Sequence, residues 1–145
     1  MKYNIALIGA GELGSRHLQG LANASNQFQI SVIDPNKNSL RVAKNRLNEA
    51  SKLSIPKVSY YDSIDSLPEA IDLVIIATNA KVRRDIIKNL IDKSSIKYLI
   101  LEKVVFQRSN DFNLIKNLLN EKNVKTWVNC ARRSFAFCSS VWDAS

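Results

Sequence analysis

Three glycines at a fixed spacing are the residues of this chain whose chemistry is easiest to interpret. Gly9, Gly11 and Gly14 follow the pattern G-x-G-x-x-G and come directly after a run of aliphatic residues. In a strand-turn-helix unit, the first glycine permits the turn, the second lets a diphosphate approach the backbone, and the third lets helix and strand pack closely. Amide groups at the start of the helix then favour the anion. The predicted binding residues of the turn are Gly9, Ala10, Gly11, Glu12, Leu13 and Gly14.

An acidic residue follows the turn at about the 20-residue distance that dinucleotide-binding sequences show. Asp34 ends a second apolar run, where a carboxylate can accept hydrogen bonds from the adenosine ribose hydroxyls and repel a 2′-phosphate. This favours NAD as the cofactor, although Lys37 and Arg41 nearby leave NADP as an alternative. In the plainer interpretation, the glycines only make a tight turn and Asp34 only caps a helix.

Polar residues also follow three later apolar runs, where parallel sheets bind their ligands. The clusters are Ala77-Thr78-Asn79, Glu102-Lys103, and Asn129 with Arg132 and Arg133. A lysine at such a strand end can hydrogen-bond a ribose or polarise a substrate hydroxyl or carbonyl, so Lys103 is the candidate catalytic residue. The alternative for Lys103 is a surface side chain paired with Glu102.

Apolar runs alternate with segments of helical spacing along the whole chain. The runs predict strands at 3–8, 28–33, 58–61, 72–78, 98–101 and 124–128. The helical stripes between them are Leu13-His17-Leu21, Leu40-Ala43-Leu47-Ala50, Val82-Ile86-Leu90 and Phe112-Ile115-Leu119. Strands that alternate with helices imply right-handed crossovers, so we predict a doubly wound parallel α/β sheet of about six strands. The strand at 72–78 is a nearly continuous aliphatic run, which predicts a central position.

The remaining side chains predict no other site. The single histidine, His17, lies on the stripe with Leu13 and Leu21 and is interpreted as a packing residue. Cys130 and Cys138 are too far from it in sequence for a zinc spacing, so no metal is expected. The chain also lacks the G-x-S-x-G nucleophile motif.

The charge balance and apolar runs limit the partners and location. Lys and Arg outnumber Asp and Glu by 21 to 13, giving a formal charge of +8. Because the basic residues are scattered over expected helix faces without interleaved aromatics, we expect no nucleic-acid site. No apolar run approaches the 18 residues of a membrane helix, so a cytoplasmic protein without membrane contact is expected.

Five stretches together, ALIGAGELGSRHLQGL, VIDPN, VIIATN, LILEKV and VNCARR, resemble the N-terminal domain of the Gfo/Idh/MocA oxidoreductase family. The resemblance extends from residue 1 to about 133. It implies an NAD(P)-binding Rossmann domain at 1–130 and an irregular tail at 131–145, the stub of a missing substrate domain. The family's Glu-Lys-Pro motif maps to Glu102, Lys103 and Val104, and its lysine typically lies beside the nicotinamide and substrate.

Three positions depart from the family pattern near that lysine. Asn79 and Val104 stand where the family usually has proline, and Arg83 stands where it usually has histidine. The first two changes bear on the local backbone and on the direction of Lys103.

The resemblance also implies a reaction and a division of labour. The full-length protein would transfer a hydride between nicotinamide and a sugar, polyol or sugar-nucleotide carbinol, with a second domain supplying the partner acid or base. The chain alone is then expected to bind cofactor with little turnover. A nucleotide-sensing domain without catalysis is the alternative function. Aromatic residues of the tail leave homo-oligomerisation open.

Overall fold

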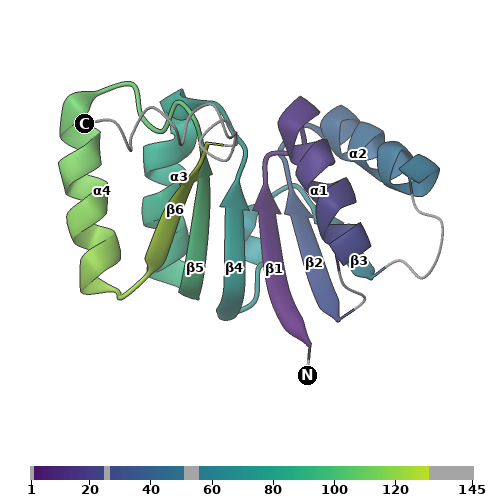
Figure 1. Cartoon of the computed structure of the whole chain (residues 1–145), viewed down its shortest axis with the longest axis horizontal. Helices are drawn as coiled ribbons and strands as arrows, with labels where there is room; N and C mark the ends of the chain where they lie inside the picture. Colours follow the sequence, from purple (N-terminus) through teal and green to yellow (C-terminus); the bar gives the residue numbers. More distant parts are fainter. Residues whose placement is uncertain (1, 25–26, 51–55, 131–145) are drawn as a thin grey trace, which may run out of the picture.

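The computed structural model describes residues 2–24, 27–50 and 56–130, which form a parallel sheet with helices on both faces (Figure 1). The strands are β1 (Tyr3–Ile8), β2 (Phe28–Ile33), β3 (Lys57–Tyr61), β4 (Ala70–Ile76), β5 (Ser95–Glu102) and β6 (Lys125–Asn129). Their order in the sheet is β3-β2-β1-β4-β5-β6, and every neighbouring pair is parallel. The predicted doubly wound α/β fold of six strands is therefore confirmed.

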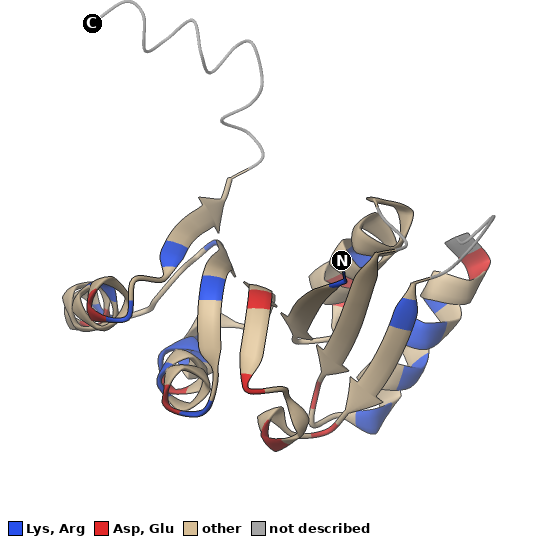
Figure 2. Ribbon diagram, turned by 90° about the horizontal axis from the view of Figure 1, so that it is seen from below, with Lys and Arg blue, Asp and Glu red and all other residues tan. Residues whose placement is uncertain are grey.

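Four helices connect these strands in two layers. The helices are α1 (Glu12–Ala24), α2 (Lys37–Ala50), α3 (Ala80–Lys93) and α4 (Ser109–Glu121). The pair α1 and α2 covers the half of the sheet with β1, β2 and β3 on one face, and α3 and α4 cover β4, β5 and β6 on the other (Figure 2). A 3-10 turn, η1 (Ile64–Ser66), lies in the crossover from β3 to β4. The covering helices change from one face of the sheet to the other between the neighbouring strands β1 and β4. Ligands of such sheets bind at this point.

Two apolar clusters hold the layers together. On one face, Leu18 of α1 and Ala43 of α2 pack with Leu7 of β1. On the other face, Ile87 of α3 and Ile115 of α4 pack against strand residues that include Ile76. The strand β4 contributes to both clusters, which confirms its central position.

The buried faces of the helices match the predicted stripes only in part: Ala43, Leu47, Leu90, Ile115 and Leu119 are buried as predicted, but other stripe residues are not. In α1 the buried residues are Gly14, Ser15, Leu18 and Ala22, whereas Leu13 is 54% exposed. In α3 and α4 the stripe residues Val82 and Phe112 are likewise exposed. The buried residues Gly14, Leu18 and Ala22 repeat at the same spacing as the predicted stripe of α1 but one position later, which is about 100° around the helix. The prediction that His17 packs in the core was wrong for this reason.

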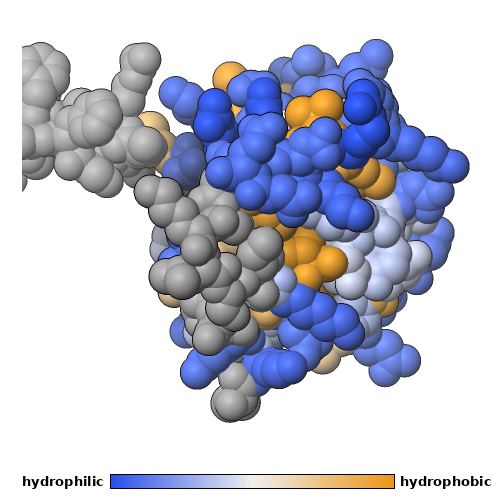
Figure 3. Space-filling model, turned by 90° about the vertical axis from the view of Figure 1, so that its right-hand side faces the viewer, coloured by the Kyte–Doolittle hydropathy of each residue, from blue (hydrophilic) through white to orange (hydrophobic). Residues whose placement is uncertain are grey.

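The surface around α2 is largely hydrophilic, with a small apolar area (Figure 3). Lys37, Arg41 and Lys44 are exposed there. Among the described residues, no helix has the length and apolar character needed to cross a membrane. The predicted irregular tail, with Arg132, Arg133 and Cys138, lies outside the described residues.

Candidate functional site

The three glycines in the turn between β1 and α1 have different structural surroundings. Gly9 has a φ of 94°, which side chains other than glycine rarely adopt, and Gly14 packs so closely that an added Cβ would overlap the Gly9 carbonyl. These two glycines make the turn and the helix contact that the spacing predicts. A Cβ at Gly11, in contrast, would meet nothing within 4 Å. Packing inside the chain does not require glycine at this position, so there is room for a ligand to approach the backbone.

Asp34 faces this turn from the end of β2. Its Oδ2 accepts a hydrogen bond from the amide N–H of Ala10 at 2.8 Å, and its Oδ1 accepts one from the amide of Asn36 at 2.8 Å. The amide of Gly9 donates to the carbonyl of Ile33 at 2.8 Å, which joins the same two strand ends. A carboxylate has about four acceptor positions, so two remain for hydroxyl groups of a ligand.

A cavity of about 590 Å³ opens beside these residues. We call it the Asp34 cavity. Its wall comes from the strand ends and α3, and its predicted site residues are Gly9, Gly11, Asp34, Ala77, Thr78 and Asn79. The side chain of Asn79 caps α3 by accepting from the amide of Lys81 at 3.2 Å. An asparagine here starts the helix without proline, because it satisfies an amide that would otherwise lack a partner.

A second cavity, of about 730 Å³, lies on the other side of the α1 amino terminus. We call it the Lys103 cavity, and the predicted site residues lining it are Leu13, Glu102, Lys103 and Asn129. His17 and Arg16 of α1 line it as well. Most of the remaining wall is apolar, from Gly20, Leu21, Ala24 and Ile75. The predicted residues thus divide between two cavities that flank the first turn of α1.

A hydrogen-bonded cluster forms one wall of the Lys103 cavity. The Oε1 of Glu102 lies 2.6 Å from His17 Nε2 and accepts a hydrogen bond from Asn129 Nδ2 at 2.6 Å. Glu102 is only 4% exposed. Burial alone would raise the pKa of Glu102, but the hydrogen bonds from Asn129 and His17, together with electrostatic attraction from His17 and Arg83, outweigh it and lower the pKa below its usual range. The carboxylate is therefore held in its charged form.

Lys103 is not part of this cluster. Within the described ranges, its exposed ammonium has no hydrogen-bond or ion-pair partner, and Glu102 binds His17 and Asn129 instead. The alternative in which Lys103 is a surface lysine paired with Glu102 does not match this geometry. The ammonium is available to a group that enters the cavity.

Not every predicted residue reaches a cavity. Glu12 points away and pairs with Arg46 of α2 at 2.7 Å, and the hydrogen bond from Arg46 lowers the pKa of Glu12. Ala10 is 1% exposed and takes part through its backbone amide. Conversely, His17 was missed as a site residue, although its spacing behind the three glycines in G-x-G-x-x-G-x-x-H was a signal for it.

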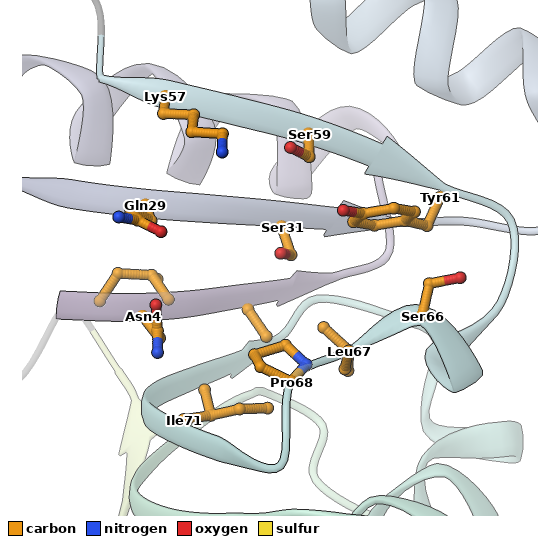
Figure 4. A pocket seen from close by; sticks show the side chains of 12 residues that line it. Asn4, Gln29, Ser31, Lys57, Ser59, Tyr61, Ser66, Leu67, Pro68 and Ile71 are labelled. Carbon is orange, nitrogen blue, oxygen red and sulfur yellow. The ribbon is translucent and has the colours of Figure 1, made fainter. Parts of the chain in front are cut away.

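A further groove of about 260 Å³ lies on the opposite face of β1, β2 and β3 (Figure 4). Gln29 and Ser31 of β2 and Ser59 of β3 line it, and Leu67 and Pro68 close one side. No predicted site residue lies in its lining. Within the described residues there is no group of three or more His, Cys, Asp or Glu side chains that could hold a metal ion.

Comparison with known proteins gives the same assignment as the fold and turn. Among curated proteins, no sequence matches this chain. Similar solved structures include myo-inositol 2-dehydrogenase from Lactobacillus plantarum, with 18% identity, a TM-score of 0.75 and 99% of this chain covered. UDP-N-acetylglucosamine 3-dehydrogenase GnnA from Acidithiobacillus ferrooxidans has 17% identity, a TM-score of 0.78 and 100% of this chain covered.

A third similar structure is the WlbA dehydrogenase from Bordetella pertussis in complex with NADH and UDP-GlcNAcA, with 17% identity, a TM-score of 0.77 and 99% of this chain covered. The chain spans 42% of the length of each of these three proteins. Residues 3–130 match the family described as "Oxidoreductase family, NAD-binding Rossmann fold". The chain therefore belongs to this Gfo/Idh/MocA oxidoreductase family and carries its NAD-binding Rossmann fold.

Proposed function

We propose that this chain binds NAD across the first turn of α1, as the cofactor domain of a dehydrogenase. The diphosphate lies against the backbone at Gly11, the adenosine half occupies the Asp34 cavity, and the nicotinamide half occupies the mouth of the Lys103 cavity. The observation that carries this proposal is the Ala10–Asp34 hydrogen bond beside the open Cβ position of Gly11. This hydrogen bond places the Asp34 carboxylate, an acceptor for ribose hydroxyls, next to the uncovered backbone at Gly11.

The residues present fit such a cofactor. Two acceptor positions of the Asp34 carboxylate remain for ribose hydroxyls, and its negative charge disfavours the 2′-phosphate of NADP. Amides at the amino terminus of α1 face the diphosphate, and Glu12 is held away from them by Arg46. Lys37 and Arg41 are exposed close to Asp34, so NADP remains the alternative cofactor.

The same arrangement suggests a role for Lys103 in hydride transfer. When bound, NAD supplies the hydride acceptor. The Lys103 ammonium, without a partner in the described chain, donates a hydrogen bond to the substrate carbinol oxygen or to the nicotinamide ribose. The charged Glu102 beneath it is held by His17 and Asn129, which keeps a negative charge at a fixed place in the cavity wall.

The substrate class comes from the neighbours. Two of the similar structures are named for sugar-nucleotide chemistry and one for inositol. We therefore propose a sugar, polyol or sugar-nucleotide carbinol as the substrate of the whole protein. Residues 1–145 alone should turn over weakly, because the resemblance places the partner acid or base in a second domain. A cytoplasmic location, a homo-oligomer and the absence of nucleic-acid binding stay predictions.

Calorimetric titration with NAD, NADH, NADP and NADPH tests the proposal. We expect saturable binding with one site per chain and a preference for NAD and NADH. Binding of adenine nucleotides without any contribution from the nicotinamide ring would favour the sensing domain instead. No binding of any of the four compounds would refute the proposed function.

A further inference from the structure

Arg83 is an unusual residue to find in the interior of this fold. It lies near the start of α3, is 1% exposed, and is the largest of the fully buried side chains described. Arginine is almost never fully buried unless its charge is matched by partners. The burial of Arg83 therefore has to be explained by the contacts of its guanidinium.

Those contacts join two loops of the candidate site. Nη2 donates to the carbonyl of Thr78, in the loop after β4. Nη1 lies within hydrogen-bond distance of three carbonyls in the segment after β5: that of Glu102, that of Val104 at 2.6 Å and that of Val105 at 2.9 Å. One side chain thus fixes backbone on both sides of Lys103 relative to the loop of Thr78.

Burial of the Arg83 guanidinium carries a free-energy cost for folding. Burial lowers the pKa of Arg83, an effect that the Glu102 carboxylate opposes, and Nε has no hydrogen-bond partner among the described atoms. An apolar side chain of similar volume often replaces a buried ionic group without loss of stability. A guanidinium, with its planar set of five donors, can hold carbonyls of two separate loops at once.

Lys103 depends on this backbone for its direction. Its side chain is exposed, and no described group binds its ammonium. Flexible lysine side chains without a partner are directed mainly by the backbone that carries them. Both loops held by Arg83 also belong to the predicted site, since Thr78 lines the Asp34 cavity and Lys103 lines the other.

We propose that Arg83 is the positioning residue for Lys103: by clamping the segment 102–105 to the loop of Thr78, it aims the Lys103 ammonium at the nicotinamide half of the cofactor. This inference rests on the proposed NAD binding. It predicts that loss of Arg83 affects the nicotinamide half of the ligand and spares the adenosine half.

Two ligands separate these halves, namely NADH and ADP, which lacks both the nicotinamide and the ribose that carries it. The experiment measures acetylation of Lys103 by an amine-reactive reagent, with peptide mass spectrometry, in the free chain and with each ligand. In the wild type, NADH should slow acetylation of Lys103 by about tenfold, the effect of one charge-assisted hydrogen bond, while ADP should not. Lys81, at the exposed start of α3, is the internal control.

The test variants are Arg83→Met and Arg83→Lys, with Arg84→Met as the matched neighbour. Arg84 pairs with Asp85 on the surface of α3 and does not reach the loop. In Arg83→Met we expect the NADH protection of Lys103 to disappear while ADP binds within about twofold of wild type. Arg83→Lys keeps a charge but fewer donors and should restore part of the protection, and Arg84→Met should retain all of it.

The outcomes are distinguishable. If wild type binds neither ligand, the proposed function fails. If wild type binds both and Arg83→Met still shows full protection of Lys103, the positioning role is wrong. If both Arg83 variants lose ADP binding as well, Arg83 is needed for the stability of the whole fold, and the specific positioning role is also wrong.

Discussion

The amide of Ala10 donates a hydrogen bond to Asp34 Oδ2 at 2.8 Å, so the glycine turn and the acidic residue after β2 form one unit. The contact joins residues from the first and second strand-turn segments at the carboxyl edge of the sheet. It holds the carboxylate beside the open backbone of Gly11. From this geometry we predict a different effect for a substitution at each residue of the glycine turn and at Asp34.

Replacement of Gly11 by alanine should weaken NADH binding without destabilising the fold. A Cβ there meets no protein atom within 4 Å, but it occupies the space that the diphosphate needs. We expect a loss of affinity of at least about tenfold by calorimetry. The free energy of unfolding in urea should change by less than about 0.5 kcal/mol.

Two other glycine variants serve as controls. Gly14→Ala should destabilise the fold by about 1–3 kcal/mol, because its Cβ overlaps the Gly9 carbonyl. Gly20→Ala, inside α1 and facing open space, should stabilise the fold by about 0.5–1 kcal/mol. Equal NADH affinity in Gly11→Ala and the wild type would contradict the proposed diphosphate position.

Asp34→Asn should change the choice between the two cofactors. The amide oxygen can still accept from Ala10, but the negative charge that repels a 2′-phosphate is gone. We expect the ratio of NADPH to NADH affinity to rise by about tenfold. Asp92→Asn, an exposed change of equal charge on α3, should leave the ratio unchanged. An unaltered ratio in Asp34→Asn would show that this carboxylate does not face the ribose.

The lowered pKa of Glu102 predicts that the stability of the fold depends on pH. Hydrogen bonds from Asn129 and His17 lower its pKa in the folded chain below the ordinary value of 4.5, despite burial. A carboxyl with a lowered folded pKa stabilises the fold above its unfolded pKa and loses this contribution as the pH falls through the folded value. At pH 7, Glu102→Gln should therefore be less stable than wild type by about 1–3 kcal/mol.

The measurement is the free energy of urea unfolding from pH 7 to pH 3. The difference between wild type and Glu102→Gln should shrink below about pH 4.5. Glu121→Gln, at the exposed end of α4, provides the matched control with a difference near zero throughout. A gap that stays constant down to pH 3 would mean that the cluster does not favour the charged carboxylate.

The excess of Lys and Arg over Asp and Glu should give no specific nucleic-acid binding site. Several cations are already paired in the structure: Arg46 with Glu12, Arg84 with Asp85 and Asp111, Lys93 with Asp65, and Lys97 with Asp72. We expect fluorescence anisotropy with labelled DNA or RNA to show only weak binding that disappears between about 50 and 200 mM salt. Sequence-dependent binding that persists at the higher salt would contradict this interpretation.

The sheet and the glycine turn could be predicted because their signals are local. Aliphatic runs such as 72–78 and the spacing of the glycines each lie within one segment of the chain, and the strand-helix alternation implies a parallel order. Asp34 was predictable because its distance from the turn is short and fixed. The strand bounds differ by a few residues, as with β4, which begins at Ala70.

The cluster around Glu102 could not be predicted in the same way. His17 and Glu102 are 85 residues apart in sequence, and only the packing of α1 across the sheet brings them together. Arg83 was predicted only as a departure from the family pattern, because residue type alone favours a solvated arginine. Its partners are backbone carbonyls, which every residue carries, so no sequence pattern distinguishes them.

The most direct test of the account is a proton-nitrogen NMR titration of the chain with NADH, followed at single backbone amides. The account predicts that the signals of 9–14 and Asp34 shift together with a single saturation curve, and that Lys103 and Asn129 follow the same curve. Shifts confined to the groove on the opposite face, around Gln29 and Ser59, or no shifts at all, would contradict it.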